Sequence, residues 1–221
     1  MKIKNVVICA AGLGSRLGLD MPKCLVEIGQ HRLIYYLLEL LEEVENVRIV
    51  VGFKENEVMD YVKRIRKDVI FVRNPEYQTT TNAYSLYLGT RDLKEPYMTI
   101  DGDMIVDKNS FIEFVNECKK DENLIGVTRA KTDDAVFVRM ETDEMVSEFS
   151  RERISDFEWS GISYFSNITV SKQGNYVYQE LEKHLPIKGK MIECYEIDTP
   201  SDLAKAYNEI DFLIGYNHQG L

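Results

Sequence analysis

The chain has 221 residues, of which 44% are hydrophobic, and this composition supplies enough apolar side chains to bury one sizeable core. Its 27 basic and 37 acidic side chains give a formal net charge of −10. This charge argues against nucleic acid as a partner, because phosphate backbones attract basic faces.

The first half of the chain alternates strand-like and helix-like segments. Residues 4–10 form a β-rich apolar run that is too short for a signal sequence or a membrane span, so we expect a cytoplasmic protein without a membrane partner. Further patterns follow in the order helix 32–44, strand 47–51, helix 54–66, strand 69–72, helix 81–92 and strand 97–100. This alternation predicts a three-layer α/β/α, Rossmann-like fold with a mixed, mainly parallel sheet, in a single domain over 1–221.

Shorter strand signals dominate the second half. A helix is expected to begin near Asn109 and Ser110, whose side-chain oxygens can cap it. Apolar runs separated by turn-like polar residues predict antiparallel strands at 124–128, 135–140 and 145–149. The remaining signals indicate strands at 159–168 and 191–197 and helices at 176–184 and 201–214.

Glycines and basic side chains gather at the end of the first predicted strand. Gly12, Gly14 and Gly18 permit positive φ angles and let backbone N–H groups approach a phosphate chain. Glycines alone are better explained as turns, and the spacing fits neither the dinucleotide fingerprint nor the P-loop. Arg16 and Lys23 add fixed positive charge, which suits a triphosphate that gains negative charge as it is attacked. The combination favours a phosphate cradle.

The run from Ala11 to Leu25 resembles the signature of the nucleoside-diphosphate-sugar pyrophosphorylase and cytidylyltransferase superfamily, in which G-x-G-x-R is followed by P-K. Within that superfamily the chain is most similar to small bacterial phosphocholine cytidylyltransferases, through residues 82–88, 160–163 and 195–198. The resemblance covers about 4–210 and is patchy between 120 and 155. The link between Arg16 and Pro22 departs from it, because sugar-phosphate enzymes usually have a longer loop there.

The resemblance implies a nucleotidyltransferase that moves a nucleoside monophosphate, most simply CMP from CTP, to a small acceptor and releases pyrophosphate. The acceptor would be a phosphate or phosphonate such as phosphocholine, 2-aminoethylphosphonate or a phosphorylated amino acid or polyol. It further implies a nucleotide-binding part at about 1–120 and an acceptor-binding part at about 121–195.

The resemblance also implies a Mg²⁺ site and a set of phosphate-binding groups. Asp103 and Asp198 match the two metal carboxylates, with Glu196 beside them, and hard oxygen ligands of this kind are what Mg²⁺ prefers. Turn or helix-cap roles are the alternative for both aspartates. Lys23 matches the lysine that neutralises the α-phosphate, and Arg16 matches the arginine that holds the β- and γ-phosphates.

We expect the nucleotide to contact backbone and side-chain groups from two stretches of the chain. The predicted nucleotide-binding residues are Ala10, Ala11, Gly12, Gly14, Ser15, Arg16, Lys23, Asn82, Ser85 and Asp101. Asn82 and Ser85 offer paired donors and acceptors for a base, although either could instead cap a helix. A direct metal contact is not expected of Asp101.

The acceptor is expected to lie against the second half of the chain. The predicted acceptor-binding residues are Arg151, Arg153, Trp159, Gly161, Tyr195 and Glu196. The two arginines suit a phosphate but fit a solvated strand edge equally well. The aromatic side chains of Trp159, Tyr164, Phe165 and Tyr195 would attract a quaternary ammonium group or else fill a core. The acidic side chains of Asp156, Glu158 and Glu193 would instead suit a primary amine.

Three other functions stay open on the sequence alone. A sugar-1-phosphate nucleotidyltransferase using UTP, GTP or dTTP would need the same residues. A catalytically silent nucleotide sensor would keep the pocket, although it would have no need of both Asp103 and Asp198. A glycosyltransferase of related fold would use an Asp-x-Asp motif, which residues 101–103 supply. Both a monomer and a homodimer are compatible with the sequence.

Overall fold

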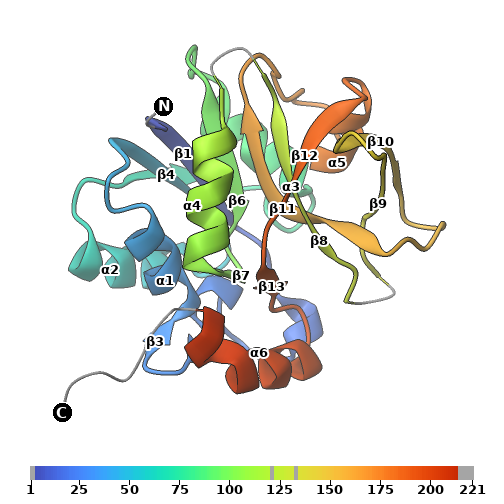
Figure 1. Ribbon diagram of the computed structural model, residues 1–221. Coiled ribbons are helices and arrows are strands. Elements are labelled where there is room, and N and C mark those ends of the chain that lie inside the picture. Colours follow the sequence, from blue (N-terminus) through green and yellow to red (C-terminus); the bar gives the residue numbers. More distant parts are fainter. Residues whose placement is uncertain (1–2, 120–121, 132–133, 214–221) are drawn as a thin grey trace.

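The computed structural model describes residues 3–119, 122–131 and 134–213. Within these ranges a nine-stranded sheet runs in the order β5-β4-β1-β6-β11-β8-β12-β10-β9 (Figure 1). Its strands are β1 (Asn5–Ala10), β4 (Asn46–Val51), β5 (Ile70–Arg73), β6 (Tyr97–Asp101), β8 (Leu124–Arg129), β9 (Phe137–Met140), β10 (Met145–Ser150), β11 (Phe157–Phe165) and β12 (Ile187–Met191). The smaller pairs are β2 (Glu27–Ile28) with β3 (His31–Arg32), and β7 (Met104–Val106) with β13 (Cys194–Glu196).

The sheet has a parallel half and a mixed half. Strands β5, β4, β1 and β6 are parallel to one another. Strand β11 then runs antiparallel to both β6 and β8, while β12 is parallel to β8 and β10 is antiparallel to β12 and β9. The prediction of a mixed sheet is confirmed, and the antiparallel β9–β10 pair is as expected, but β8 also has a parallel neighbour.

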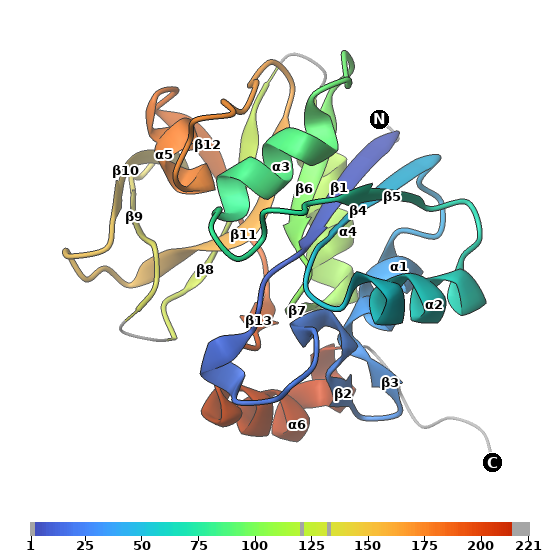
Figure 2. The same ribbon diagram turned by 180° about the vertical axis from the view of Figure 1, so that it is seen from behind.

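Helices cover both faces of the sheet. The helices are α1 (Leu33–Leu40), α2 (Glu55–Ile65), α3 (Asn82–Thr90), α4 (Lys108–Glu117), α5 (Val177–Glu182) and α6 (Pro200–Leu213), with short 3-10 helices η1 (Ser15–Leu17) and η2 (Lys23–Leu25). Figure 1 shows α1, α2 and α4 over one face, and Figure 2, seen from behind, shows α3 and α5 over the other. The three predicted layers are therefore present.

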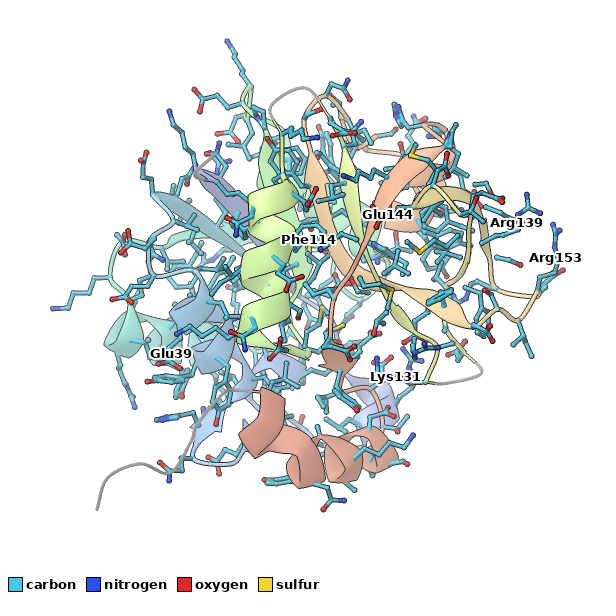
Figure 3. The ribbon with its side chains drawn as sticks, in the orientation of Figure 1. Glu39, Phe114, Lys131, Arg139, Glu144 and Arg153 are labelled. Atoms are coloured by element: carbon cyan, nitrogen blue, oxygen red, sulfur yellow. The ribbon has the colours of Figure 1, made fainter. Side chains whose placement is uncertain are left out.

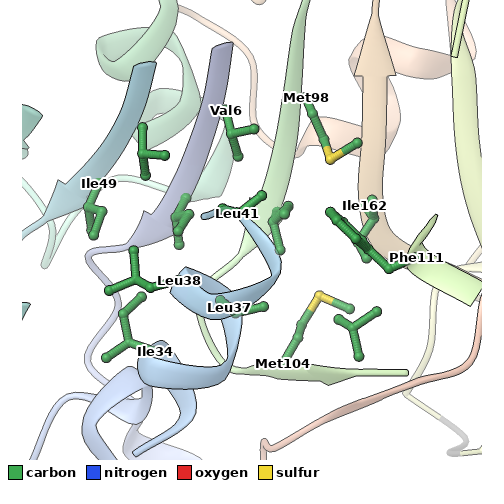
Figure 4. Close-up of a cluster of buried hydrophobic side chains, with 14 of the residues drawn as sticks. Val6, Ile34, Leu37, Leu38, Leu41, Ile49, Met98, Met104, Phe111 and Ile162 are labelled. Atoms are coloured by element: carbon green, nitrogen blue, oxygen red, sulfur yellow. The ribbon is translucent and has the colours of Figure 1, made fainter. Parts of the chain in front are cut away.

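Strand β1 shows how the sequence separates these layers. Val6 packs with the α1 side chains Ile34 and Leu37 on one face (Figure 4), and Ile8 belongs to the same cluster. Val7 points to the opposite face and packs with α3. All of them are buried. Successive side chains of a strand point to opposite faces, so a continuous apolar run marks a strand that is covered on both sides.

Two predicted boundaries are corrected by the structure. Helix α4 begins at Lys108, because Asp107 is its cap and accepts a hydrogen bond from the Ser110 backbone N–H at 2.7 Å. The single strand expected at 191–197 is two strands, β12 and β13, and β13 leaves the main sheet to pair with β7. Ile214, the expected end of the last helix, lies outside the described residues.

Candidate active site

The glycine loop and the acidic turn meet at one edge of the sheet because β1 and β6 are parallel neighbours. Cys9 lies opposite Asp101 in their register, and the Gly102 backbone N–H donates to the Cys9 carbonyl at 2.9 Å. A Cβ atom on Gly102 would lie only 2.9 Å from the Ala10 Cβ. Glycine therefore lets the two turns touch at the carboxyl ends of their strands, where α/β proteins collect ligands.

Within the glycine loop, Gly14 makes room for Lys23. Gly14 has a φ of +63°, and a Cβ atom on it would lie 2.8 Å from the Lys23 Cγ. Gly18 also has a positive φ, of +71°, but faces open space. Gly14 is thus needed both for its backbone conformation and for the close passage of the lysine stem.

Three carboxyl groups converge beside this loop. Among the described residues, Asp103, Glu196 and Asp198 have side-chain oxygens that all lie within 4.8 Å of one another. The β7–β13 ribbon brings them together, because Glu196 pairs with Met104 and the Ile197 N–H donates to the Asp103 carbonyl at 2.9 Å. Figure 1 shows this ribbon just beyond the ends of β1 and β6.

Lys23 and Arg16 are the cations that face these acids. The Lys23 Nζ lies 2.7 Å from Asp103 Oδ2 and also contacts Asp198 Oδ1, so one ammonium group bridges the two aspartates. Burial opposes the charge on Lys23, but Asp103 and Asp198 outweigh it and raise the Lys23 pKa. Arg16 Nη2 donates to Asp198 Oδ2 at 2.6 Å.

The acids outnumber these cations. Burial, followed by repulsion from Asp103, raises the pKa of Asp101 to about 8. Desolvation by surrounding protein atoms, then Asp103 and Asp198, raises the pKa of Glu196 well above its usual value. An excess of crowded carboxyl oxygens is what a hard divalent cation neutralises, so the donor set fits Mg²⁺. The assignment of Asp103 and Asp198 as its ligands stays a prediction.

A small cavity of about 190 Å³ lies beside the glycine loop. Predicted residues that line it are Ala11, Gly12, Asn82, Ser85, Asp101, Asp103 and Glu196. Buried Asn74 donates to the Ser85 Oγ at 3.0 Å and so fixes it. Asn82 Oδ1 also accepts from the Val177 N–H at 3.4 Å, and therefore supports the start of α5. Ala10, Gly14 and Ser15 belong to the same strand and loop without lining this cavity.

A larger cleft of about 720 Å³ lies on the other side of the acids. Predicted residues that line it are Arg16, Asn82, Asp101, Arg151, Trp159, Gly161, Tyr195, Glu196 and Asp198. Gly161 has a φ of +79°, and a Cβ atom there would lie 2.8 Å from Asp101 Oδ2. Because Asp101 and Glu196 line both cavities, the acidic group stands between them.

Arg153 does not join this cleft. Its side chain is 77% exposed and pairs with Glu148, which also pairs with Arg139 at 3.5 Å. Figure 3 shows Arg153 and Arg139 at the outer edge of the molecule, away from Lys131, which lines the cleft. Only one residue separates Arg151 from Arg153, but the bend after β10 turns the second side chain outward.

The other acceptor candidates divide between the cleft and the core. Tyr164 and Phe165, for which an aromatic site and a core role were both open, are buried in the core. Asp156 and Glu193 do not line the cleft, whereas Glu158 does. Sequence reasoning missed several cleft residues, namely Lys131, Asp134, Tyr176, Tyr178 and Asp202. No motif distinguishes them, because the segment after β8 and the starts of α5 and α6 bring them together only in the fold.

In the part of the chain that the structure describes, no helix has the length and apolar character to span a membrane.

Comparisons with known proteins agree on the fold. The chain is 40% identical over 112 residues to choline-phosphate cytidylyltransferase of Streptococcus pneumoniae (strain ATCC BAA-255 / R6), a match covering 48% of each protein. The chain spans about half the length of the first three curated relatives that it matches, namely 48%, 45% and 53% of their respective lengths.

Two solved structures match nearly the whole chain. CTP:phosphocholine cytidylyltransferase from Streptococcus pneumoniae superposes with a TM-score of 0.75 and 28% identity, over 95% of this chain and 100% of that one. The inositol-1-phosphate CTP transferase from T. maritima superposes with a TM-score of 0.80 over 99% and 98% of the two chains, and its 19% identity supports the fold alone. A family model matches residues 6–156, and the chain therefore belongs to the MobA-like NTP transferase domain family.

Proposed function

We propose that this protein transfers CMP from CTP to a small phosphate or phosphonate acceptor and releases pyrophosphate. The observation that carries the proposal is the position of Lys23 and the acids Asp103 and Asp198 between two cavities. One cavity has the size and amide groups suited to a base, and the other has the arginines suited to a phosphorylated acceptor. Cytidine is preferred because relatives of the chain are described as cytidylyltransferases.

The proposed reaction is one in-line displacement at the α-phosphorus. An oxygen of the acceptor phosphate forms a bond to the α-phosphorus while the bond to the bridging oxygen of the β-phosphate breaks, and that electron pair leaves with pyrophosphate. Lys23 would stabilise the α-phosphate charge, and Arg16 the leaving group. Mg²⁺ held by Asp103 and Asp198 would neutralise phosphate charge when bound. No covalent enzyme intermediate is needed, and we place the reaction in the cytoplasm.

Acceptors that carry an ammonium group suit the cleft best. Glu158 lines it, and burial raises the Glu158 pKa against the opposing effect of Lys131, so a further cation would stabilise the charged form of Glu158. Lys131 lies 5.0 Å from the Tyr195 ring centre and Arg151 lies 5.9 Å from that of Tyr176, so both rings already attract positive charge. Phosphocholine and 2-aminoethylphosphonate combine such a group with a phosphorus-containing acid.

An acceptor panel tests the proposal. The protein would be incubated with Mg²⁺ and CTP, UTP, GTP or dTTP against phosphocholine, 2-aminoethylphosphonate, phosphorylated amino acids and polyols, and sugar 1-phosphates. We expect pyrophosphate release with CTP and an ammonium-bearing acceptor, and loss of release in the D103N variant. Release with sugar 1-phosphates alone would replace the proposal by its sugar-nucleotide alternative, and tight CTP binding without any turnover would favour a sensor.

A further inference from the structure

A chain of ion pairs crosses the large cleft. Asp198 Oδ2 accepts from Arg16 Nη2 at 2.6 Å, and Arg16 Nη1 in turn donates to Asp134 Oδ2 at 2.7 Å. The second oxygen of the same carboxylate, Asp134 Oδ1, accepts from Arg151 Nη2 at 2.8 Å. Arg16 comes from the glycine loop, whereas Asp134 and Arg151 come from the far wall.

Asp134 therefore places one carboxylate between two guanidinium groups. Two guanidinium groups that share the two oxygens of one anion are also arranged to hold a phosphate or phosphonate, which offers three such oxygens. The side chain of Asp134 is 65% exposed, so a ligand in the cleft has access to the same arginines. Arg16 is also held from its other side by Asp198, and this contact keeps its orientation when Asp134 moves away.

We propose that Asp134 is an internal substitute for the phosphorus-containing acid groups of the substrates, and that it competes with them for Arg16 and Arg151. The assignment of these groups rests on the proposed function, in which Arg16 meets the leaving pyrophosphate and Arg151 meets the phosphate or phosphonate of the acceptor. Asp134 lowers the apparent affinity for every anion, because the arginines are available only when it has left them. A phosphonate or phosphate dianion binds the two arginines more strongly than a singly charged carboxylate does, and it therefore displaces Asp134 at a lower concentration.

The test is direct anion binding, which needs no turnover. Methylphosphonate and acetate would be titrated calorimetrically, at constant ionic strength, into the wild-type protein and the D134N variant. We expect D134N to bind methylphosphonate and acetate each about fivefold more tightly, as follows from removing two exposed ion pairs, with acetate the weaker ligand of both proteins. The matched control is D92N, which removes a carboxylate paired with Arg48 at 2.5 Å outside the cleft and should leave both affinities unchanged.

Unchanged or weaker methylphosphonate binding in D134N would overturn the inference, because it would mean that Asp134 orients the arginines instead of competing for them. The R151M substitution provides a second test. It should weaken methylphosphonate binding both in the wild-type protein and in the D134N variant. Tighter binding in D134N combined with no turnover on any acceptor would refute the proposed function and leave this inference standing.

Discussion

Replacing Gly14 by alanine tests whether the glycine loop positions Lys23. Gly14 has a φ of +63°, and left-handed backbone costs an alanine about 1–2 kcal/mol. The new Cβ would also lie 2.8 Å from the Lys23 Cγ. The lysine cannot simply rotate away, because its Nζ is held by Asp103 at 2.7 Å and by Asp198. The substitution should therefore shift the ammonium group as well as strain the backbone.

Gly18 provides the matched control. Its φ of +71° imposes the same conformational cost on alanine, but a Cβ there meets nothing within 4 Å. In urea denaturation we expect G18A to lose about 1–2 kcal/mol of unfolding free energy and G14A to lose at least as much, because the clash with Lys23 adds to the same backbone cost. Their turnover should differ, because a misplacement near 1 Å in a reacting group costs about a hundredfold. Equal kcat/KM values for CTP in the two variants would refute the reasoning that Gly14 serves Lys23.

Three further experiments probe other parts of the site. D103N should lower kcat by about a hundredfold or more and remove the Mg²⁺-dependent rise in Tm, which steady-state kinetics and thermal melts with and without EDTA would measure. K54M removes the Lys54 Nζ contacts to the Asp20 carbonyl, at 2.5 Å, and carboxylate, at 2.9 Å, which tie the phosphate loop to α2. K54M should raise the KM for CTP about threefold and lower the unfolding free energy by less than ~1 kcal/mol. K54R, which keeps the positive charge, should restore the KM. R151A should raise the KM for the acceptor about tenfold. R153A removes only a solvent-exposed ion pair, so its acceptor KM should stay within about twofold of wild type. Equal effects of the two substitutions would contradict the placement of Arg151 in the cleft and Arg153 outside it.

The parallel half of the sheet was predictable because its signals are local. Val47, Ile49 and Val50 belong to an apolar run, which predicts a strand covered by helices on both faces, and the structure buries all three. The glycine loop was equally visible, since Gly14 and Lys23 stand in a short stretch of sequence. Periodicity and turn chemistry act over a few residues, and these features need no more than that.

The acceptor side depends on partners that are distant in sequence. Strand β7 has three residues, and it exists because β13 pairs with it from a point some ninety residues later. Strand propensity depends on such tertiary context, so the sequence suggested neither β7 nor the split between β12 and β13. Arg151 and Arg153 looked equivalent for the same reason, because only the fold decides which of them faces the cleft.

The central claim is that Asp103 and Asp198 hold a metal beside Lys23, at the α-phosphate of a bound CTP. A crystal structure with Mn²⁺ and a non-hydrolysable CTP analogue, with the metal located by anomalous scattering, tests it most directly. The account predicts Mn²⁺ bound to oxygens of both aspartates, with the α-phosphate next to the Lys23 Nζ and the cytosine in the small cavity near Asn82 and Ser85. Metal bound elsewhere, or an α-phosphate out of reach of Lys23, would contradict it.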